Sequence, residues 1–329
     1  MSTADLAAFS NNAIAFASVV YVLAFLGHLV EWVLGRTVPV DVPARSTVAV
    51  GAGPTVRPAD ASMEPTDSSL EVRSERVELF ARIGVSLTIV AALLHGAALV
   101  TRGLGAEPAR VPWGNMYEFS LTGTFVVTSI YLVLLRKHDL RWLGPVVTGF
   151  AVVILMLAVL VLYVPAGPLV PALHSYWLVI HVIAAIIATG AFTLGGMTSL
   201  LFLVKSRAEG RGGTGASGYI ARLPQAAVLD RVAYRLHAFG FPVWTFAALV
   251  AGPIWAQYAW GRYWGWDPKE VWAFITWVIY ASYLHARATA GWKGRSAAII
   301  ALIGLATLLF NFVGINYFFG STSQHSYAG

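Results

Sequence analysis

The sequence predicts an all-α, polytopic integral membrane protein, and composition and hydropathy support that prediction. Of the 329 residues, 57% are hydrophobic and only 12% are charged, against about 25% charged in an average soluble domain. The mean hydropathy is +0.69. Apolar runs of about 20 residues recur along the chain, and each is long enough to cross about 30 Å of hydrocarbon as a helix. A water-soluble globular fold is therefore excluded.

Eight apolar runs are candidate membrane spans, and we expect them to form one membrane domain over residues 1–329. The loops on one side contain most of the Lys and Arg, whereas those on the other contain Arg102, Arg110, Arg262 and Lys269. Because positive residues are retained in the cytoplasm during insertion, we expect the first side to be cytoplasmic and both termini to be extracytoplasmic. The formal charge of +6 is then an orientation signal, and no nucleic acid partner is expected. The runs are residues 13–34, 80–101, 116–135, 145–164, 178–204, 242–258, 268–287 and 297–317.

Three segments between the spans have their own character. Residues 36–78 are rich in Pro, Ser and scattered charges without a period, and residues 205–222 are Gly-rich and polar. Both are typical of flexible linkers, which we expect in the cytoplasm. Residues 223–239 place their aliphatic side chains on one helical face, which predicts a short helix on the inner membrane surface before the sixth span.

The tryptophans are concentrated in one outer loop. Six of the twelve lie between residues 255 and 277, whereas an interfacial aromatic belt would spread over all the spans. Dense indole rings offer flat, polarisable area with few donors, which suits stacking on a large planar apolar ligand. We call residues 255–272, WAQYAWGRYWGWDPKEVW, the outer tryptophan segment. Its candidate ligand contacts are Trp255, Trp260, Trp264 and Trp266.

The end of this segment has the pattern of a helix start. Asp267 is an N-cap residue, Pro268 occupies the first helical position, and Glu270 completes a capping box. We expect Asp267 chiefly to cap the seventh span, and we also count it among the candidate cofactor-binding residues. A fixed cap would also hold the indoles before it on a rigid edge.

The histidines suggest a metal centre on the outer side. The chain has no cysteine, so metal ligands have to come from His, Met, Tyr or carboxylates. His181 lies about one turn inside the outer end of the fifth span, and the tail with His325 can fold back over the tryptophan segment at about 3.3 Å per extended residue. Two neutral imidazoles on opposite faces suit a six-coordinate haem iron. We expect a mobile tail, with His325 the more easily released ligand, and His174 remains an alternative to His181.

The other histidines differ in depth. His285 lies about 27 Å deeper than the start of its span, near the cytoplasmic boundary, so it cannot ligate the same iron. As an ionisable residue within a span, it is still a functional candidate. We expect structural roles for His28 and His95, and solvated positions for His138 and His237 beside cytoplasmic loops.

The segment VPWGNMYEF, residues 111–119, begins the third span on the outer side. Its Trp113 has two interpretations. The segment is either an interfacial helix start or a further wall of the cavity formed by the tryptophan segment.

These segments together resemble the CcsA/ResC family of cytochrome c maturation proteins of system II, which a WWD segment marks. The resemblance implies that two outer histidines ligate haem iron, matching His181 and His325, and that His285 belongs to an inner haem site. It also implies a membrane partner of the CcsB/ResB type, which supplies the other inner ligand unless His28 does. The matching stretches are VPWGNMYEF, SYWLVIHV, LDRVAYRLHAFGFP, AWGRYWGWDPKEVWAFITWVIYASYLHAR and HSYA.

The resemblance also implies a function. The chain would be a haem-handling subunit in the plasma membrane that binds haem b as substrate and presents it, extracytoplasmically, to the CxxCH motif of apocytochrome c. Cytochrome c synthase activity would require the CcsB/ResB-type partner, and thiol-reducing proteins would act indirectly. Two alternatives stay open. One is a haem exporter or relay without ligation chemistry, and the other is a permease or lipid-linked-sugar transferase, for which the outer loops offer few carboxylates.

Overall fold

The computed structural model describes residues 2–35, 67–167, 175–210, 219–289, 291–319 and 323–324, and every regular element within them is helical. The predicted all-α class is therefore confirmed for the described residues. The 3-10 turn η1 directly precedes α4, and the π-helical turns η3 and η4 join α7 to α8 and α10 to α11. In chain order the elements are α1 (Thr3–Gly35), α2 (Asp67–Leu104), α3 (Met116–Leu135), η1 (Arg141–Leu143), α4 (Gly144–Val161), α5 (Tyr176–Gly210), α6 (Tyr219–Arg222), α7 (Ala226–Phe246), η3 (Ala247–Ala251), α8 (Gly252–Trp260), α9 (Pro268–Thr289), α10 (Arg295–Leu309), η4 (Phe310–Gly314) and α11 (Ile315–Phe318).

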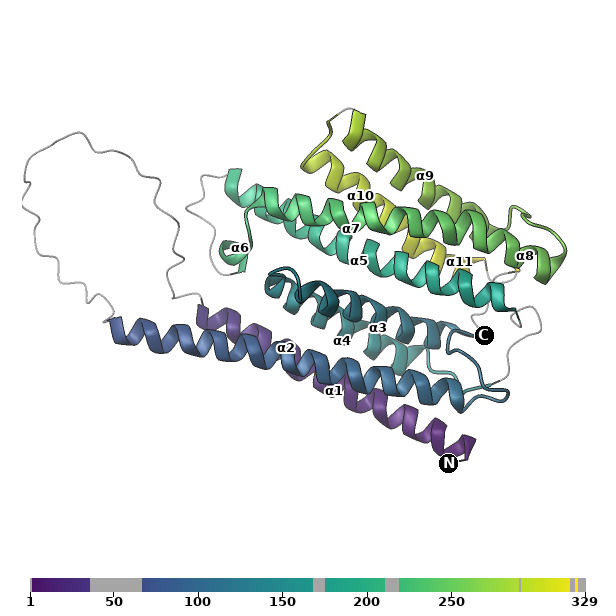
Figure 1. Cartoon of the computed structure of the whole chain (residues 1–329), viewed down its shortest axis with the longest axis horizontal. Helices are drawn as coiled ribbons and strands as arrows, with labels where there is room; N and C mark the ends of the chain where they lie inside the picture. Colours follow the sequence, from purple (N-terminus) through teal and green to yellow (C-terminus); the bar gives the residue numbers. More distant parts are fainter. Residues whose placement is uncertain are drawn as a thin grey trace, which may run out of the picture.

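Seven helices of the described chain are long and apolar enough to cross a membrane. They match the first six predicted spans and the eighth, so a multi-pass membrane protein is confirmed. The predicted seventh span is α9, which is more polar because Glu270 and Arg287 lie in its first and last turns. α9 nevertheless packs along α10 and against α7, running antiparallel to α10 (Figure 1). The eighth crossing and the sides of the two termini stay predictions.

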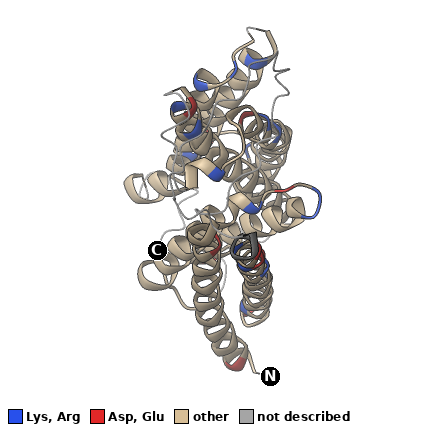
Figure 2. Ribbon diagram, turned by 90° about the vertical axis from the view of Figure 1, so that its left-hand side faces the viewer, with Lys and Arg blue, Asp and Glu red and all other residues tan. Residues whose placement is uncertain are grey.

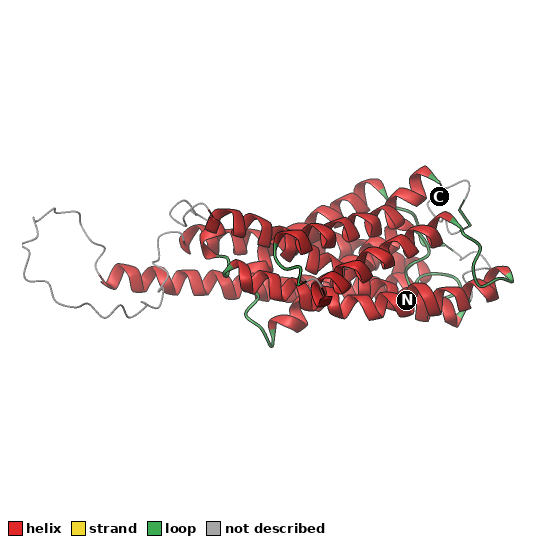
Figure 3. Cartoon of the chain, turned by 90° about the horizontal axis from the view of Figure 1, so that it is seen from above, coloured by secondary structure: helices red, strands yellow, loops and turns green. Residues whose placement is uncertain are grey.

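The helices form two groups that run along one common axis (Figures 1 and 3). α1 to α4 pack around a buried cluster that includes Tyr21 and Leu155. α5, α7, α9 and α10 pack around a second cluster that includes Phe192 and Tyr280. α5 also packs on α3, and this contact joins the two groups.

Each predicted linker is partly helical. α2 starts at Asp67 and so includes the end of the 36–78 segment, where Glu78 pairs with Arg82 one turn later at 3.0 Å. α5 continues to Gly210 and α6 follows at Tyr219, so the 205–222 segment is helical at both ends. The remainder of both segments lies outside the described residues.

The helix predicted on the inner membrane surface is instead the start of the sixth span. α7 runs unbroken over Ala226–Phe246 and continues through η3 into α8. The aliphatic face that suggested a surface helix packs on other helices, where Leu229 is fully buried. His237 is consequently buried as well, against the ring of Tyr280. The predictions of a surface helix over 223–239 and of a solvated His237 are therefore wrong.

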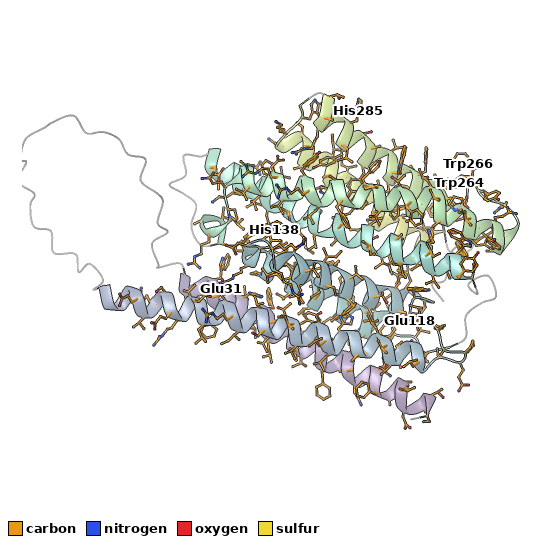
Figure 4. All side chains as sticks on the ribbon, in the orientation of Figure 1. Glu31, Glu118, His138, Trp264, Trp266 and His285 are labelled. Atoms are coloured by element: carbon orange, nitrogen blue, oxygen red, sulfur yellow. The ribbon has the colours of Figure 1, made fainter. Side chains whose placement is uncertain are left out.

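The two ends of the bundle differ in character. Lys and Arg gather at the end where α5 ends and α6 lies, which faces the viewer in Figure 2. Trp264, Trp266 and Glu118 lie at the opposite end (Figure 4). We call the basic end the inner end and the tryptophan end the outer end. Their assignment to the cytoplasm and the exterior remains a prediction.

Candidate functional site

A cavity opens at the outer end, where several helices meet. α3, α5, the continuous α7–α8 helix, α9 and the last span each contribute to its wall, and with its open mouth it holds about 1200 Å³ of empty space. The enclosed part of the cavity measures only about 190 Å³, which is less than the roughly 300–1,000 Å³ of pockets for organic ligands, so a large ligand would extend into the open mouth. Its aromatic lining residues among those described are Trp113, Phe119, Trp244, Trp255, Tyr263, Trp264 and Phe312.

His181 of α5 lies in the wall of this cavity. Its Nδ1 is 2.9 Å from the carbonyl oxygen of Ala247. Because a carbonyl oxygen only accepts, Nδ1 carries the proton, and the lone pair of the neutral imidazole resides on Nε2. The ring of Trp255 stacks on the imidazole, with centroids 5.9 Å apart and 12° between the planes. Metal-ligating histidines are usually oriented by such a bond to the other ring nitrogen.

An irregular turn in the sixth span sets the position of the Ala247 carbonyl. In the π-helix η3, the N–H of Gly252 bonds back five residues to Ala247. Pro253 accounts for this turn, since it lacks an N–H and its ring would clash with the carbonyl four residues earlier in a regular α-helix. Gly252 leaves room for the imidazole, because a Cβ there would lie 3.1 Å from Cε1 of His181.

The capping box predicted at the end of the tryptophan segment is present. Oδ1 of Asp267 accepts from the N–H of Lys269 at 3.0 Å, and Oε2 of Glu270 accepts from the N–H of Asp267 at 3.1 Å. The same Glu270 oxygen accepts from the N–H of Gly265 at 2.8 Å. Trp266 lies between these bonds with φ at 57°, a left-handed conformation that bulky residues rarely adopt. The bonds on both sides therefore hold this turn in place.

The predicted tryptophans divide into lining and supporting residues. Trp113, Trp255 and Trp264 line the cavity. Trp260 packs edge-on against Trp255, with ring centroids 4.8 Å apart. Trp266 is 69% exposed and packs edge-on against Trp264 (Figure 4). Within the described residues, the indole Nε1–H of Trp264 is buried without a hydrogen-bond acceptor.

Asp267 also fastens the C-terminal tail. The Ser323 hydroxyl donates to Oδ1 of Asp267 and the N–H of Gln324 donates to Oδ2, both at 2.7 Å. Ser323 and Asp267 are both buried. At Ser323 and Gln324 the tail is therefore bonded to the tryptophan segment. The expectation of a mobile tail at His325 stays a prediction. His325 and His174 lie outside the described residues.

A buried ion cluster holds the segment around Trp113. The carboxylate of Glu118 accepts from Arg102 at 3.0 Å and from Arg110 at 2.6 and 3.0 Å. Arg102 and Glu118 are almost wholly buried. Asn115 caps α3 by accepting from the Glu118 N–H at 2.9 Å, and Trp113 and Asn115 both line the cavity. The segment is therefore a helix start and a cavity wall at once.

Two asparagines of the last span line the cavity and were not predicted from the sequence. Asn311 lies in η4, and Nδ2 of Asn316 donates to the Phe312 carbonyl at 2.7 Å. Oδ1 of each is buried without a donor among the described residues. Such unmatched acceptors indicate a polar ligand group or ordered water. Two amides five residues apart in an apolar run were the available signal.

The comparisons with known proteins agree on one family. The profile described as cytochrome C assembly protein matches residues 113–321, which include every described residue that lines the cavity. A cytochrome c biogenesis protein CcsA from Synechococcus sp. (strain JA-2-3B'a(2-13)) is 33% identical over 312 residues, covering 77% of this chain and 87% of the relative. This chain belongs to the CcsA family. CcsA proteins of Synechococcus elongatus and Guillardia theta are 35% and 34% identical, and each match covers 74% of this chain.

A solved structure shares the fold of this CcsA-family chain. It is the cytochrome c haem lyase CcmF, with a TM-score of 0.63 and 15% sequence identity. The likeness covers 95% of this chain and 47% of CcmF, so the chain spans about half the length of that protein. At this identity the likeness concerns the helical architecture alone.

His28 and His285, the two histidines of this CcsA-family chain that were considered for an inner haem site, lie far apart in the bundle. His285 is exposed on α9 near the inner end (Figure 4). His28 is buried in α1, in a recess where a Cβ at Gly84 or Gly144 would lie 2.7 or 2.6 Å from the imidazole. α1 and α9 lie on opposite sides of the bundle (Figure 1), so His28 and His285 are not brought together. His95 is also buried within α1 to α4.

Proposed function

We propose that this chain binds haem as a substrate in the outer cavity and presents it for covalent attachment to apocytochrome c. Membership of the CcsA family assigns the chain to cytochrome c biogenesis. The observation that carries the finer proposal is His181, whose Nδ1 bond to Ala247 directs the lone pair to Nε2 in the wall of an aromatic cavity. Neutral imidazole is a common axial ligand of haem iron.

The residues that line the cavity are chemically suited to a porphyrin. Indole and phenyl faces suit stacking against a flat macrocycle. The buried Nε1–H of Trp264 and the amides of Asn311 and Asn316 are polar groups able to meet the polar edge of the ligand. The chain's own part would be to hold, orient and shield the haem.

For the second axial ligand we propose His325. It follows Gln324 directly in the sequence, and Gln324 is bonded to Asp267 within the tryptophan segment. Asp267 would then have two roles, capping α9 and positioning the tail. In this proposal the imidazole of the CxxCH motif displaces His325 when apocytochrome c binds.

The attachment step needs positioning more than acid–base chemistry from this chain. Each cysteine S–H of CxxCH adds across one haem vinyl group, forming a C–S bond at one vinyl carbon and a C–H bond at the other, with no net oxidation or reduction. Holding the vinyl groups beside the thiols supplies the entropic part of catalysis. Because the chain has no cysteine, it cannot be trapped in mixed disulfides with the peptide.

Further parts of the proposal concern partners and location. The exposed His285 on α9 would join an inner haem site completed by a CcsB/ResB-type partner. Its exposure supports a ligand from another chain over one from His28. The protein would lie in the plasma membrane with the outer cavity on the extracytoplasmic side, and thiol-reducing proteins would keep the CxxCH cysteines reduced.

The sugar-transfer alternative finds little support. It would need a pair of outward carboxylates for catalysis. Of the four in the outer loops, Glu118 is bonded to two arginines and Asp267 and Glu270 are engaged in the helix cap. That leaves the exposed Glu107, which cannot form a catalytic pair alone. The haem relay alternative differs from our proposal only in whether attachment occurs on this chain.

The test is covalent haem attachment in cells that co-produce this chain, a CcsB-type partner and a reporter apocytochrome with one CxxCH motif. We expect His181→Ala to reduce haem-stained reporter at least tenfold, and the control His138→Ala, exposed at the inner end, to leave it unchanged. Equal attachment with His181→Ala and wild type would contradict the proposal. Attachment that appears only after a separate synthase is supplied would support the relay instead.

A further inference from the structure

A second groove runs between α2 and α3 and shares no lining residue with the outer cavity. α2 packs mainly on α1, which leaves this side of it less covered. With its open side, the groove holds about 2190 Å³ of empty space. It extends on α2 from Ala81 to Ala97 and on the α3 side from Phe125 to Arg141.

The wall of the groove is aliphatic and faces outward. Ile89 is 44% exposed, Leu93 68% and Val133 60%. At about 1.5 Å per residue, the stretch from Ala81 to Ala97 is about 24 Å long. This length exceeds half of a hydrocarbon core of about 30 Å, so the groove is long enough to hold an acyl chain of one leaflet.

The inner end of the groove has a basic rim. Arg82 and Arg141 both bond to Glu78, at 3.0 and 2.8 Å. Arg136 and Lys137 are exposed and have no carboxylate of the described residues within ion-pair distance. The four cations outnumber Glu78 and Asp139, so the rim attracts anions. The cations that line the groove are Arg82, Arg136, Lys137 and Arg141, and His138 lies beside them.

We propose that this groove binds one anionic phospholipid, with its phosphate at Arg136 and Lys137 and an acyl chain along Ile89 and Leu93. Basic pockets between membrane helices are a recurring site for acidic lipid head groups. Haem is a second ligand that combines apolar and anionic parts. Among the described lining residues, however, Phe125 is the one carbocyclic ring on which a macrocycle could stack. A flexible chain suits this wall better than a flat macrocycle.

The test measures lipid retention by native mass spectrometry on the full chain in detergent. Phosphatidylglycerol and phosphatidylcholine with identical acyl chains are compared. We expect preferential retention of phosphatidylglycerol and about a 30-fold loss of its affinity in the double variant Arg136→Gln, Lys137→Gln, from about 1 kcal/mol per basic residue. The matched control Arg231→Gln, Arg235→Gln removes two exposed arginines of α7 and should retain the lipid as wild type does.

A second variant tests the acyl-chain part of the proposal. Ala97 lines the groove and is exposed, so Ala97→Trp should fill the groove without entering the core. It should weaken retention of both lipids, while circular dichroism shows an unchanged helix content. Equal retention of the two lipids by wild type would overturn the proposal, as would equal losses in the rim variant and the α7 control. Retention of a porphyrin or a polypeptide in the groove in place of lipid would also overturn it.

Discussion

At the scale of single residues, the site depends on how the imidazole of His181 is held. The Ala247 carbonyl fixes its tautomer, the Trp255 ring lies against its face, and Gly252 gives it space. The sequence could single out His181 by its depth and Trp255 by its neighbours. It could not single out Gly252, because the role of this residue depends on which helices meet in the folded protein.

Gly252→Ala should weaken haem binding at the outer site. The added Cβ would lie 3.1 Å from Cε1 and 3.2 Å from Nδ1 of His181, so the imidazole has to shift from its bond to Ala247. Overpacking of this kind costs about 1–3 kcal/mol, so we expect about a 5- to 160-fold rise in the haem Kd. Haem titration followed by visible absorption measures it.

Gly123→Ala is the matched control for this prediction. A Cβ at Gly123 of α3 would have its nearest neighbour, Cε1 of Phe119, at 4.0 Å. This variant should bind haem as wild type does. An unchanged Kd in Gly252→Ala would show that the close approach of Gly252 to His181 does not matter for binding.

At the scale of elements, features that depend on adjacent residues were predictable, whereas the way in which one helix continues into the next was not. The Asp267 cap was predicted because capping depends on residues adjacent in sequence. The continuous α7 was missed because an apolar face that packs on helices has the same periodicity as one that lies on a membrane. The π-helix η3 was missed because Pro253 alone does not say whether a helix kinks, ends or widens.

The connection between α2 and α3 gives a prediction about stability. Glu118 and Glu78 each bond two arginines, but Glu118 is 1% exposed and Glu78 is 42% exposed in its side chain. Glu118→Gln would leave two arginines at the buried site without a counter-charge, which costs about 3–5 kcal/mol. Glu78→Gln should cost less than about 1 kcal/mol, because solvent screens an exposed pair.

Thermal unfolding of the two purified variants, followed by circular dichroism, measures this difference. We expect a clearly lower Tm for Glu118→Gln and a Tm close to wild type for Glu78→Gln. Similar Tm values for the two variants would mean that the buried cluster is not needed to hold the segment around Trp113.

At the scale of the whole molecule, hydropathy predicted the helical bundle, while charge predicted its orientation. Apolar runs were reliable because each span satisfies its own backbone hydrogen bonds in lipid. α9 is the exception, since its polar ends and aromatic content lower its hydropathy although it packs as a bundle helix. Which side chains share the cavity could not be predicted, because that depends on packing between distant spans.

The orientation is testable with single introduced cysteines, since the chain has none of its own. Thr3→Cys and Glu107→Cys at the outer end should react with a membrane-impermeant maleimide in intact cells. His138→Cys and Lys293→Cys should react only after permeabilisation, because we expect the inner end to be cytoplasmic. Labelling of Lys293→Cys in intact cells would mean that α9 does not cross the membrane.

The central claim is that His181 ligates haem iron in the outer cavity. The most direct measurement is the visible spectrum of the purified, haem-loaded protein, compared between wild type, His181→Ala and His285→Ala. We predict a low-spin, six-coordinate spectrum for the outer site that persists in His285→Ala, is lost in His181→Ala, and is restored there by added imidazole. An outer-site spectrum identical in His181→Ala and wild type would contradict the account.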